Sequence, residues 1–200
     1  MADAKSLHDA FIDELRDTYD AEKQLLKVLP KMAKAASSDA LREAFQSHLD
    51  ETRGQVGRLE EIFASLDEKV RGKHCAGVAG IIEEGRSIME EDFDDTTMDA
   101  CLIAAGQRAE HYEMAAYGTL VAWAETMGHV AAAELLQQTL AEEKAADEKL
   151  SSLAESGINQ EAADAAHSGD EDDRDQEPTR RATTPKRGAR KKSAPTARRR

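Results

Sequence analysis

Apolar residues recur every three or four positions along four long stretches, and this spacing predicts four amphipathic helices. The stretches cover about residues 5–36, 40–66, 98–127 and 129–154. Only short breaks, at 37–39 and at Gly128, separate the members of each pair, so each pair is expected to form an antiparallel hairpin. Because the chain has only 4 Pro and 12 Gly and is rich in helix formers, the composition also favours an all-α protein.

A longer segment, residues 67–95, connects the two predicted hairpins, and part of it, 78–91, has the pattern of a short amphipathic helix. At about 1.5 Å per helical residue, this length suits a crossover along a bundle of ~40 Å. Two hairpins joined by one long crossover are the connectivity of ferritin-like bundles. We therefore predict an all-α, ferritin-like four-helix bundle over residues 1–158.

The last part of the chain, residues 159–200, is predicted to be a disordered tail because it cannot bury enough apolar surface. Acidic residues dominate 170–177, whereas 178–200 contain ten Lys or Arg and no acid. The net charge of −13 therefore combines a strongly acidic body with a basic end. An acidic body repels nucleic acid and membranes, so any nucleic acid would be held non-specifically by the tail. The alternative is that the tail lies against its own acidic residues.

Several features bear on cellular location. The longest apolar run, 76–82, is too short to cross a bilayer, and residues 1–15 lack the apolar core of a secretory signal. Two cysteines, Cys75 and Cys101, are too few for a disulfide framework. We expect a cytoplasmic protein with no membrane partner.

Acidic residues interrupt the apolar face of each predicted bundle helix. Glu22 lies seven residues from both Leu15 and Leu29, on the same face. The intervals in the two hairpins also match, because 29 residues separate Glu22 from Glu51 and 30 separate Glu113 from Glu143. Similar hairpins place such acids at one level of the bundle. The candidates on these faces are Glu22, His48, Glu51, Glu110, Glu113, Glu143 and Asp147.

Each of these residues alone has a structural explanation. A single Glu beside an apolar face usually extends its carboxylate to water, and a lone His is more often a core residue than a ligand. Their joint occurrence favours a metal site, because several unpaired carboxylates in one core would cost several kcal/mol each. Carboxylates can bridge two cations about 3.5–4 Å apart. Oxygen-rich ligation with His suits iron or manganese better than zinc.

Four segments carry a resemblance to a known family. They are DTYDAEKQL (17–25), HLDETRGQVGRLE (48–60), IAAGQRAEHYEMAAYGTL (103–120) and LAEEKAADEKL (140–150). They resemble the YciE/YciF family of ferritin-like proteins over about residues 5–156, and EHYEMAAYGTL is the most specific part. The resemblance implies a site for two Fe ions, with Mn as the alternative metal, an association with stress responses and a homodimer.

The site departs from the common di-iron pattern, in which two helices each supply one Glu and the other two each supply E-x-x-H. Gly54 and Ala146 stand where His would follow Glu51 and Glu143. His48, three residues before Glu51, is a substitute ligand, and Asp147 either binds metal or orients a ligand. Glu110 and Glu113 form E-x-x-E, as in rubrerythrin-like sites. The hydroxyls of Tyr19 and Tyr117 are expected near this site.

Two classes of function agree with this sequence. The first is a metal-redox protein that reacts with dioxygen or peroxide, with the sequence leaving open whether it is an enzyme. The second is a structural or interaction protein whose basic tail binds nucleic acid. Metal analysis distinguishes them, because the first class requires about two ions per chain and the second requires none.

Overall fold

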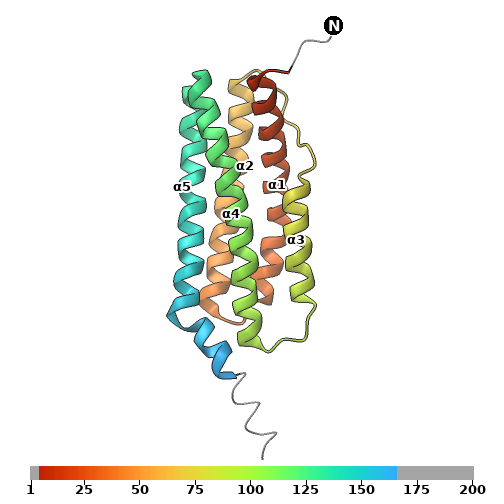
Figure 1. Ribbon diagram of the computed structural model, residues 1–200, viewed down its shortest axis with the longest axis vertical. Coiled ribbons are helices and arrows are strands. Elements are labelled where there is room, and N and C mark those ends of the chain that lie inside the picture. Colours follow the sequence, from red (N-terminus) through yellow and green to blue (C-terminus); the bar gives the residue numbers. More distant parts are fainter. Residues whose placement is uncertain (1–4, 166–200) are drawn as a thin grey trace, which may run out of the picture.

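The computed structural model describes residues 5–165, which contain five α-helices and no strand (Figure 1). The predicted all-α class is confirmed, and the short helix in the crossover lies two residues earlier than expected. The predicted tail from residue 166 onward lies outside the described residues. The helices are α1 Leu7–Ala35, α2 Asp39–Ser65, α3 Ala76–Met89, α4 Asp95–Met127 and α5 Val130–Leu153.

Short polar side chains start the long helices, as the sequence predicts. Ser6 and Asp9 form a reciprocal capping box at the start of α1, with the Ser6 amide donating to Asp9 Oδ2 over 2.7 Å. Ser38 and Asp94 cap α2 and α4 by accepting amide hydrogen bonds from the first turn. Gly128 ends α4 with a φ of 77°, a left-handed conformation that glycine adopts without strain.

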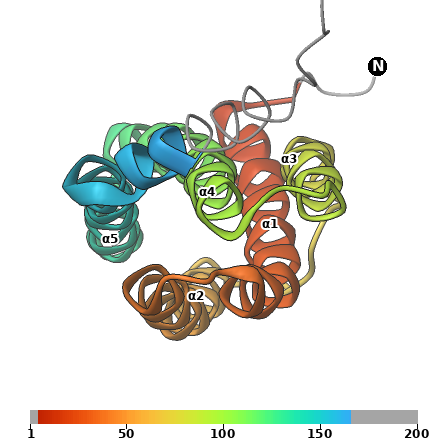
Figure 2. The same ribbon diagram turned by 90° about the horizontal axis from the view of Figure 1, so that it is seen from below.

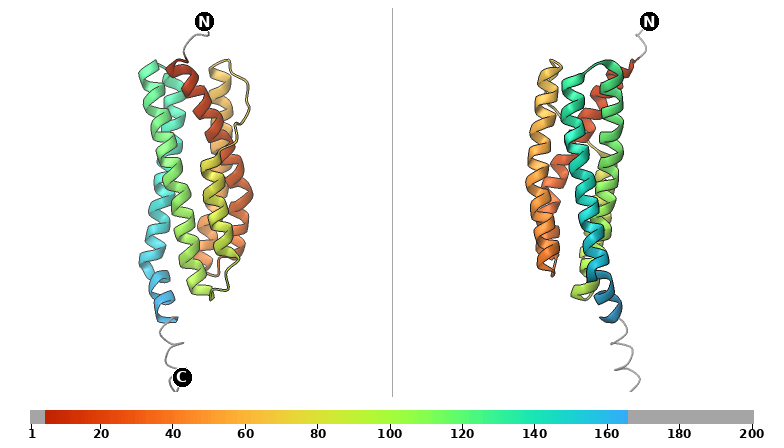
Figure 3. Two further views of the ribbon diagram at one scale, coloured as in Figure 1. Left: turned by 45° about the vertical axis from the view of Figure 1, so that its right-hand side comes forward. Right: turned by 90° about the vertical axis from the view of Figure 1, so that its left-hand side faces the viewer.

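The four long helices form two hairpins that pack side by side (Figure 1). α1 packs on α2 and α4 packs on α5, and the hairpins meet through α2–α5 and α1–α4 contacts. α3 lies outside this group, against α4 and α1 (Figure 2). The crossover that contains α3 runs along the bundle (Figure 3). The predicted ferritin-like connectivity is thus confirmed.

α3 is held closely against its neighbours at its first turn. A Cβ atom on Gly77 would lie 2.6 Å from the Tyr112 ring, so a residue with a side chain would displace α3 or Tyr112. The Cys75 amide donates to Asp20 Oδ2 over 2.9 Å, and Gln24 Nε2 donates to the Cys75 carbonyl over 3.1 Å. These contacts fix the crossover to α1 and α4.

The buried apolar residues form two groups. We call the group near the start of α1 the upper core and the group near the α1–α2 turn the lower core. The upper core includes Phe11, Leu15, Leu59, Phe63, Leu120 and Leu136. The lower core includes Leu25, Leu29, Leu41, Phe45, Leu102 and Leu150. Five buried residues, Glu22, His48, Glu110, Glu113 and Glu143, lie at the boundary between the segments that supply these two cores, whereas the buried Asp99 lies at the start of α4.

Two details differ from the sequence prediction. The three- and four-residue apolar spacing predicts Leu26 on the buried face of α1, but Leu26 is only half-buried and the neighbouring Leu25 is buried instead. Gly157 interrupts the last helix with a φ of 157°, but residues 159–165 are helical again, where a disordered tail was predicted. Burial of Ile158 in the lower core holds the chain on the bundle past the glycine. No helix among residues 5–165 is long and apolar enough to span a bilayer.

Candidate metal centre

Four buried side chains converge between the two cores. His48 on α2, Glu110 and Glu113 on α4, and Glu143 on α5 each place one ligand atom within 4.8 Å of the others. The three-residue spacing on α4 puts both glutamates on one helix face. Helix periodicity therefore brings together four of the seven predicted ligands from three helices.

Glu22 adds the contribution of α1. Its side chain is fully buried, and Oε1 accepts a hydrogen bond from the Tyr117 hydroxyl. Burial raises the pKa of Glu22 to about 8, and the nearby charge of Glu143 acts in the same direction. Tyr117 thus lies where the sequence predicts, whereas the Tyr19 hydroxyl donates to Glu60 over 2.8 Å, away from the cluster.

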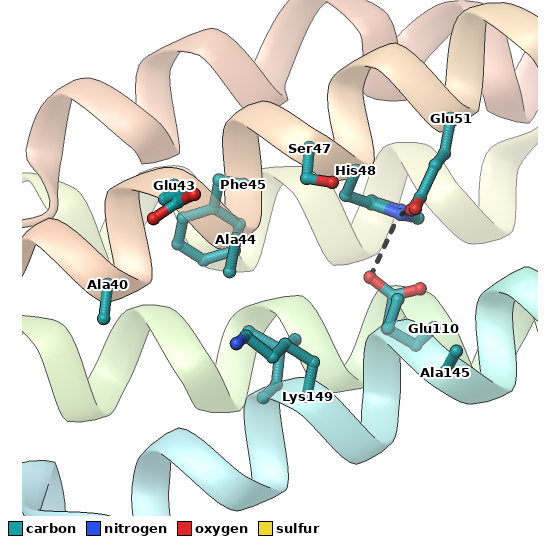
Figure 4. A pocket seen from close by; sticks show the side chains of 12 residues that line it. Ala40, Glu43, Ala44, Phe45, Ser47, His48, Glu51, Glu110, Ala145 and Lys149 are labelled. Carbon is teal, nitrogen blue, oxygen red and sulfur yellow. Dashed lines mark hydrogen bonds and ion pairs between the residues drawn. The ribbon is translucent and has the colours of Figure 1, made fainter.

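His48 links the buried cluster to Glu51. Its Nε2 atom lies 3.4 Å from Glu110 Oε1 and 3.8 Å from Glu143 Oε2, while Nδ1 lies 3.4 Å from Glu51 Oε2 (Figure 4). Burial opposes the charged imidazole, but the hydrogen bond with Glu51 and the charges of Glu143 and Glu22 raise the pKa of His48. The Glu51 side chain is 44% exposed, so the expected inward position of Glu51 is not observed. It turns along α2 toward the imidazole instead.

Asp147 lies apart from the other predicted ligands. Its Oδ1 atom accepts a hydrogen bond from Gln107 Nε2 over 3.2 Å and lies 3.3 Å from Nε2 of the exposed His111. Asp147 lies one helical turn after Glu143, and its side chain is directed at α4 rather than into the cluster. The structure therefore gives Asp147 a role in positioning α5 against α4.

The cluster contains buried carboxylate oxygens that no described protein group satisfies. Glu22 and Glu110 each have one such oxygen, and Glu113 and Glu143 have two each. Burial raises the pKa of Glu110 to about 8 and raises the pKa values of Glu113 and Glu143 well above the ordinary value. Orphaned buried polar groups are rare in folded proteins, because each forfeits its hydration without a replacement. Protons or cations are needed to balance this charge.

A polar network next to the cluster was missed by the sequence analysis. Arg58 forms an ion pair with Glu142 and donates through Nε to Thr139 Oγ1 over 2.9 Å. Gln55, which is fully buried, donates through Nε2 to the same Glu142 carboxylate over 3.2 Å. The positive charge of Arg58 favours the ionised form of Glu22 and so opposes part of the rise in the pKa of Glu22 that burial causes. One sequence signal could have revealed Arg58. It lies seven residues after Glu51, about two helical turns, and therefore on the same side of α2.

The donor set fits a metal ion. It combines an imidazole with carboxylates, a mixture that suits iron or manganese, and two divalent cations would offset most of the negative charge. The oxygens without partners are the atoms that would coordinate such an ion. Geometry and chemistry therefore agree on a candidate metal centre in the middle of the bundle.

A pocket of about 270 Å³ connects this centre with the surface between α2 and α5. His48 and Glu110 face each other at one end of it, and Ala40 and Glu43 lie toward the other (Figure 4). The centre is therefore accessible to a molecule larger than water.

Comparisons with known proteins match nearly the whole described region. The family described as Domain of unknown function (DUF892) matches residues 6–163. Protein YciF of Escherichia coli (strain K12) is 45% identical over 163 residues, which cover 81% of this chain and 98% of the relative.

Solved structures give the same result. The crystal structure of the E. coli stress protein YciF has a TM-score of 0.75 at 45% identity and covers 78% of this chain and 99% of its own. YcfI from Rhodopseudomonas palustris has a TM-score of 0.73 at 42% identity, and the match covers 75% of this chain and 96% of YcfI. A protein from Xanthomonas campestris pv. campestris is 20% identical, with a TM-score of 0.61, and the match covers 84% of this chain and 99% of that protein. At this identity the likeness shows the fold alone.

Proposed function

The chain belongs to the DUF892 family, and we propose that this member binds two metal ions, most suitably iron, in the centre of its bundle. The observation that carries the proposal is the set of six buried carboxylate oxygens without a partner on Glu22, Glu110, Glu113 and Glu143. A core of this kind is stabilised by cations, since ionised carboxylates left unpaired cost several kcal/mol each. The relative described as the E. coli stress protein YciF motivates a role in a stress response.

The proposed ligands are the five converging residues and one residue at the edge. His48, Glu110, Glu113 and Glu143 already place ligand atoms within 4.8 Å of one another, and the buried Glu22 lies near enough to be influenced by the charge of Glu143. Glu51 joins them by rotating its side chain from the surface, because its carboxylate already contacts His48. Asp147 is not included among the ligands, and it instead positions α5 through Gln107.

The protein side chains around the centre would support oxidation chemistry. Ferrous iron, when bound, supplies the electrons that reduce dioxygen or peroxide. Tyr117 holds Glu22 in a fixed orientation, and the Arg58–Glu142 pair closes the side of the cluster toward the upper core. The two apolar cores exclude water above and below. We propose a redox function on these grounds.

Metal analysis of purified protein loaded with Fe(II) or Mn(II) under anaerobic conditions tests the proposal. We expect about two ions per chain, and substantially fewer in Glu113→Gln. Glu148→Gln is the matched control, because Glu148 is an exposed acid on α5 outside the cluster. Binding of no metal by the parent protein, or equal binding by the parent and Glu113→Gln, would exclude this function.

The basic tail favours a second function. The family match ends at residue 163, so the ten Lys and Arg of 178–200 lie beyond the part shared with relatives. We propose that this segment binds nucleic acid through phosphates and without sequence preference. A homodimer, which the family resemblance implies, would present two tails and increase the avidity.

A further inference from the structure

The pocket between α2 and α5 is too large to serve only dioxygen or hydrogen peroxide. Its volume is about 270 Å³, whereas one water molecule takes up about 30 Å³ in the liquid. Small-molecule sites commonly measure about 300–1,000 Å³, so the pocket lies just below that range. Its size suits a compact organic molecule.

The walls of the pocket select an apolar body. They are formed mainly by Ala44, Phe45, Ala145, Ala146 and Leu150. The exposed Glu43, Glu51 and Lys149 also line the pocket, two acids against one base, so the charge at its opening disfavours an anionic ligand (Figure 4). An apolar molecule is stabilised here by leaving water.

The inner end of the pocket selects a neutral hydrogen-bond donor. Glu110 is only 3% exposed, and its Oε2 atom has no hydrogen-bond partner. An anionic ligand would gain no favourable charge from Glu110 or from Glu143 beside it. A neutral O–H group can instead form a hydrogen bond with the Glu110 carboxyl group.

We propose that this pocket binds a small organic hydroperoxide, with its apolar part between α2 and α5 and its peroxide group at Glu110. The inference rests on the proposed iron site and names its substrate class. Breaking the O–O bond to give one alcohol and one water requires two electrons and two protons. Ferrous iron, held by the proposed ligands, would supply the electrons and become ferric, and the protons would come from solvent.

Ligand binding tests the pocket independently of any metal. Cumyl alcohol, the product of cumene hydroperoxide, has the same apolar body and O–H group but cannot be reduced at the site. Titrated into metal-free full-length protein, it should shift the NMR signals of the Ala44 and Ala145 methyl groups in a saturable manner. Ala44→Leu should abolish the shift of the Ala145 methyl signal, whereas Ala64→Leu, at an exposed alanine on the same helix, should retain the shifts of both methyl signals.

Reaction rates test the substrate class. With iron-loaded protein, Ala145→Leu should slow oxidation of ferrous iron by cumene hydroperoxide about tenfold more than oxidation by hydrogen peroxide, as expected for a steric change in an apolar pocket. Ala131→Leu, at an exposed position on α5, is the control and should affect neither rate.

The outcomes separate this inference from the proposed function. Iron binding with peroxide oxidation but no alcohol binding would overturn the pocket inference alone. Equal slowing of the reactions with both peroxides by Ala145→Leu would also overturn the pocket inference. A change of oligomeric state in Ala145→Leu would overturn it too, because a second copy of the chain would then cover the mouth of the pocket. Alcohol binding without iron binding would overturn both the proposed function and the hydroperoxide as substrate.

Discussion

The Tyr117 hydroxyl, on α4, donates a hydrogen bond to Oε1 of Glu22, on α1, where both side chains are fully buried. This bond joins the two hairpins at the level of the candidate metal centre. It also supplies the only protein donor to Glu22 among the described residues, since the other carboxylate oxygen has no partner. The orientation of the α1 ligand therefore depends on a residue of α4.

Replacement of Tyr117 by Phe should destabilise the metal-free protein by about 1–3 kcal/mol, because a buried acceptor then loses its donor. Affinity for metal should also fall, since Glu22 is no longer oriented. Urea denaturation measures the first effect, and a metal titration measures the second. Tyr19→Phe is the control, because its hydroxyl contacts the exposed Glu60, which water can solvate. Equal destabilisation by the two variants would contradict this account.

Replacement of Glu143 by Gln should have opposite effects on the two forms of the protein. Without metal, burial disfavours the ionised form of Glu143, and Gln has no proton to take up on folding, so stability should be equal to or greater than that of the parent. With metal, the change removes a charged ligand. The parent should gain about 2.7 kcal/mol at a free metal concentration one hundred times the dissociation constant, and the variant should gain clearly less. Thermal melts with and without Mn(II) check both expectations, and a large loss of stability in the metal-free variant would identify Glu143 as an ordinary structural residue.

The metal-free protein should become less stable as the pH rises from about 5 to about 8. In the folded protein the pKa values of Glu22 and Glu110 are raised to about 8, whereas an unfolded Glu titrates near 4.3. Between these values the unfolded chain binds fewer protons than the folded chain, so the free energy of unfolding decreases with pH, by up to about 1.4 kcal/mol per unit for each group. His48, whose pKa is also raised, acts in the same direction.

Urea denaturation at several pH values in the presence of a chelator measures this dependence. Glu113→Gln should flatten it, because one buried group with a raised pKa is removed. A metal-free parent protein whose stability rises over this pH range would show that the carboxylates are not protonated in the folded state.

Removal of the basic tail should abolish nucleic-acid binding. If about five of the ten charges contact phosphates, the logarithm of the binding constant should fall with the logarithm of salt concentration at a slope near −4.5. Gel-shift titrations at low salt, with the full chain and with a chain ending at Glu177, provide the measurement. Equal binding by the two chains, or binding by neither, would refute the proposal.

The helices were predictable because their apolar spacing and their caps are local properties of the sequence. Ser38, Asp94 and Gly128 end or begin helices as expected. The choice of Leu26 over Leu25 was wrong, because neighbouring residues differ by about 100° around a helix and either lies near the edge of the apolar face. The helical residues 159–165 were not predicted, because the burial of Ile158 that holds this segment on the bundle depends on tertiary contacts.

The candidate site was predictable only as far as helix faces determine it. Glu22, Glu110, Glu113 and Glu143 are buried together, as their spacing indicates. Glu51, three residues after the buried His48, is exposed and contacts only the outer side of the imidazole, a difference in depth that helix periodicity does not specify. Arg58 and Asp147 belong to contacts between helices, and pairing across helices depends on bundle geometry that a single sequence pattern does not contain. Their roles therefore emerge only from the structure.

The division of the interior into an upper and a lower core has a consequence for how the bundle opens. Apolar packing holds both ends, whereas the middle is a layer of carboxylates that repel one another without a cation. Local stability is lowest where satisfied contacts are fewest, so amide hydrogens around this middle layer should exchange faster than those at either end. Helix separation then begins at the centre of the molecule while both ends stay closed, and ions can enter or leave without global unfolding.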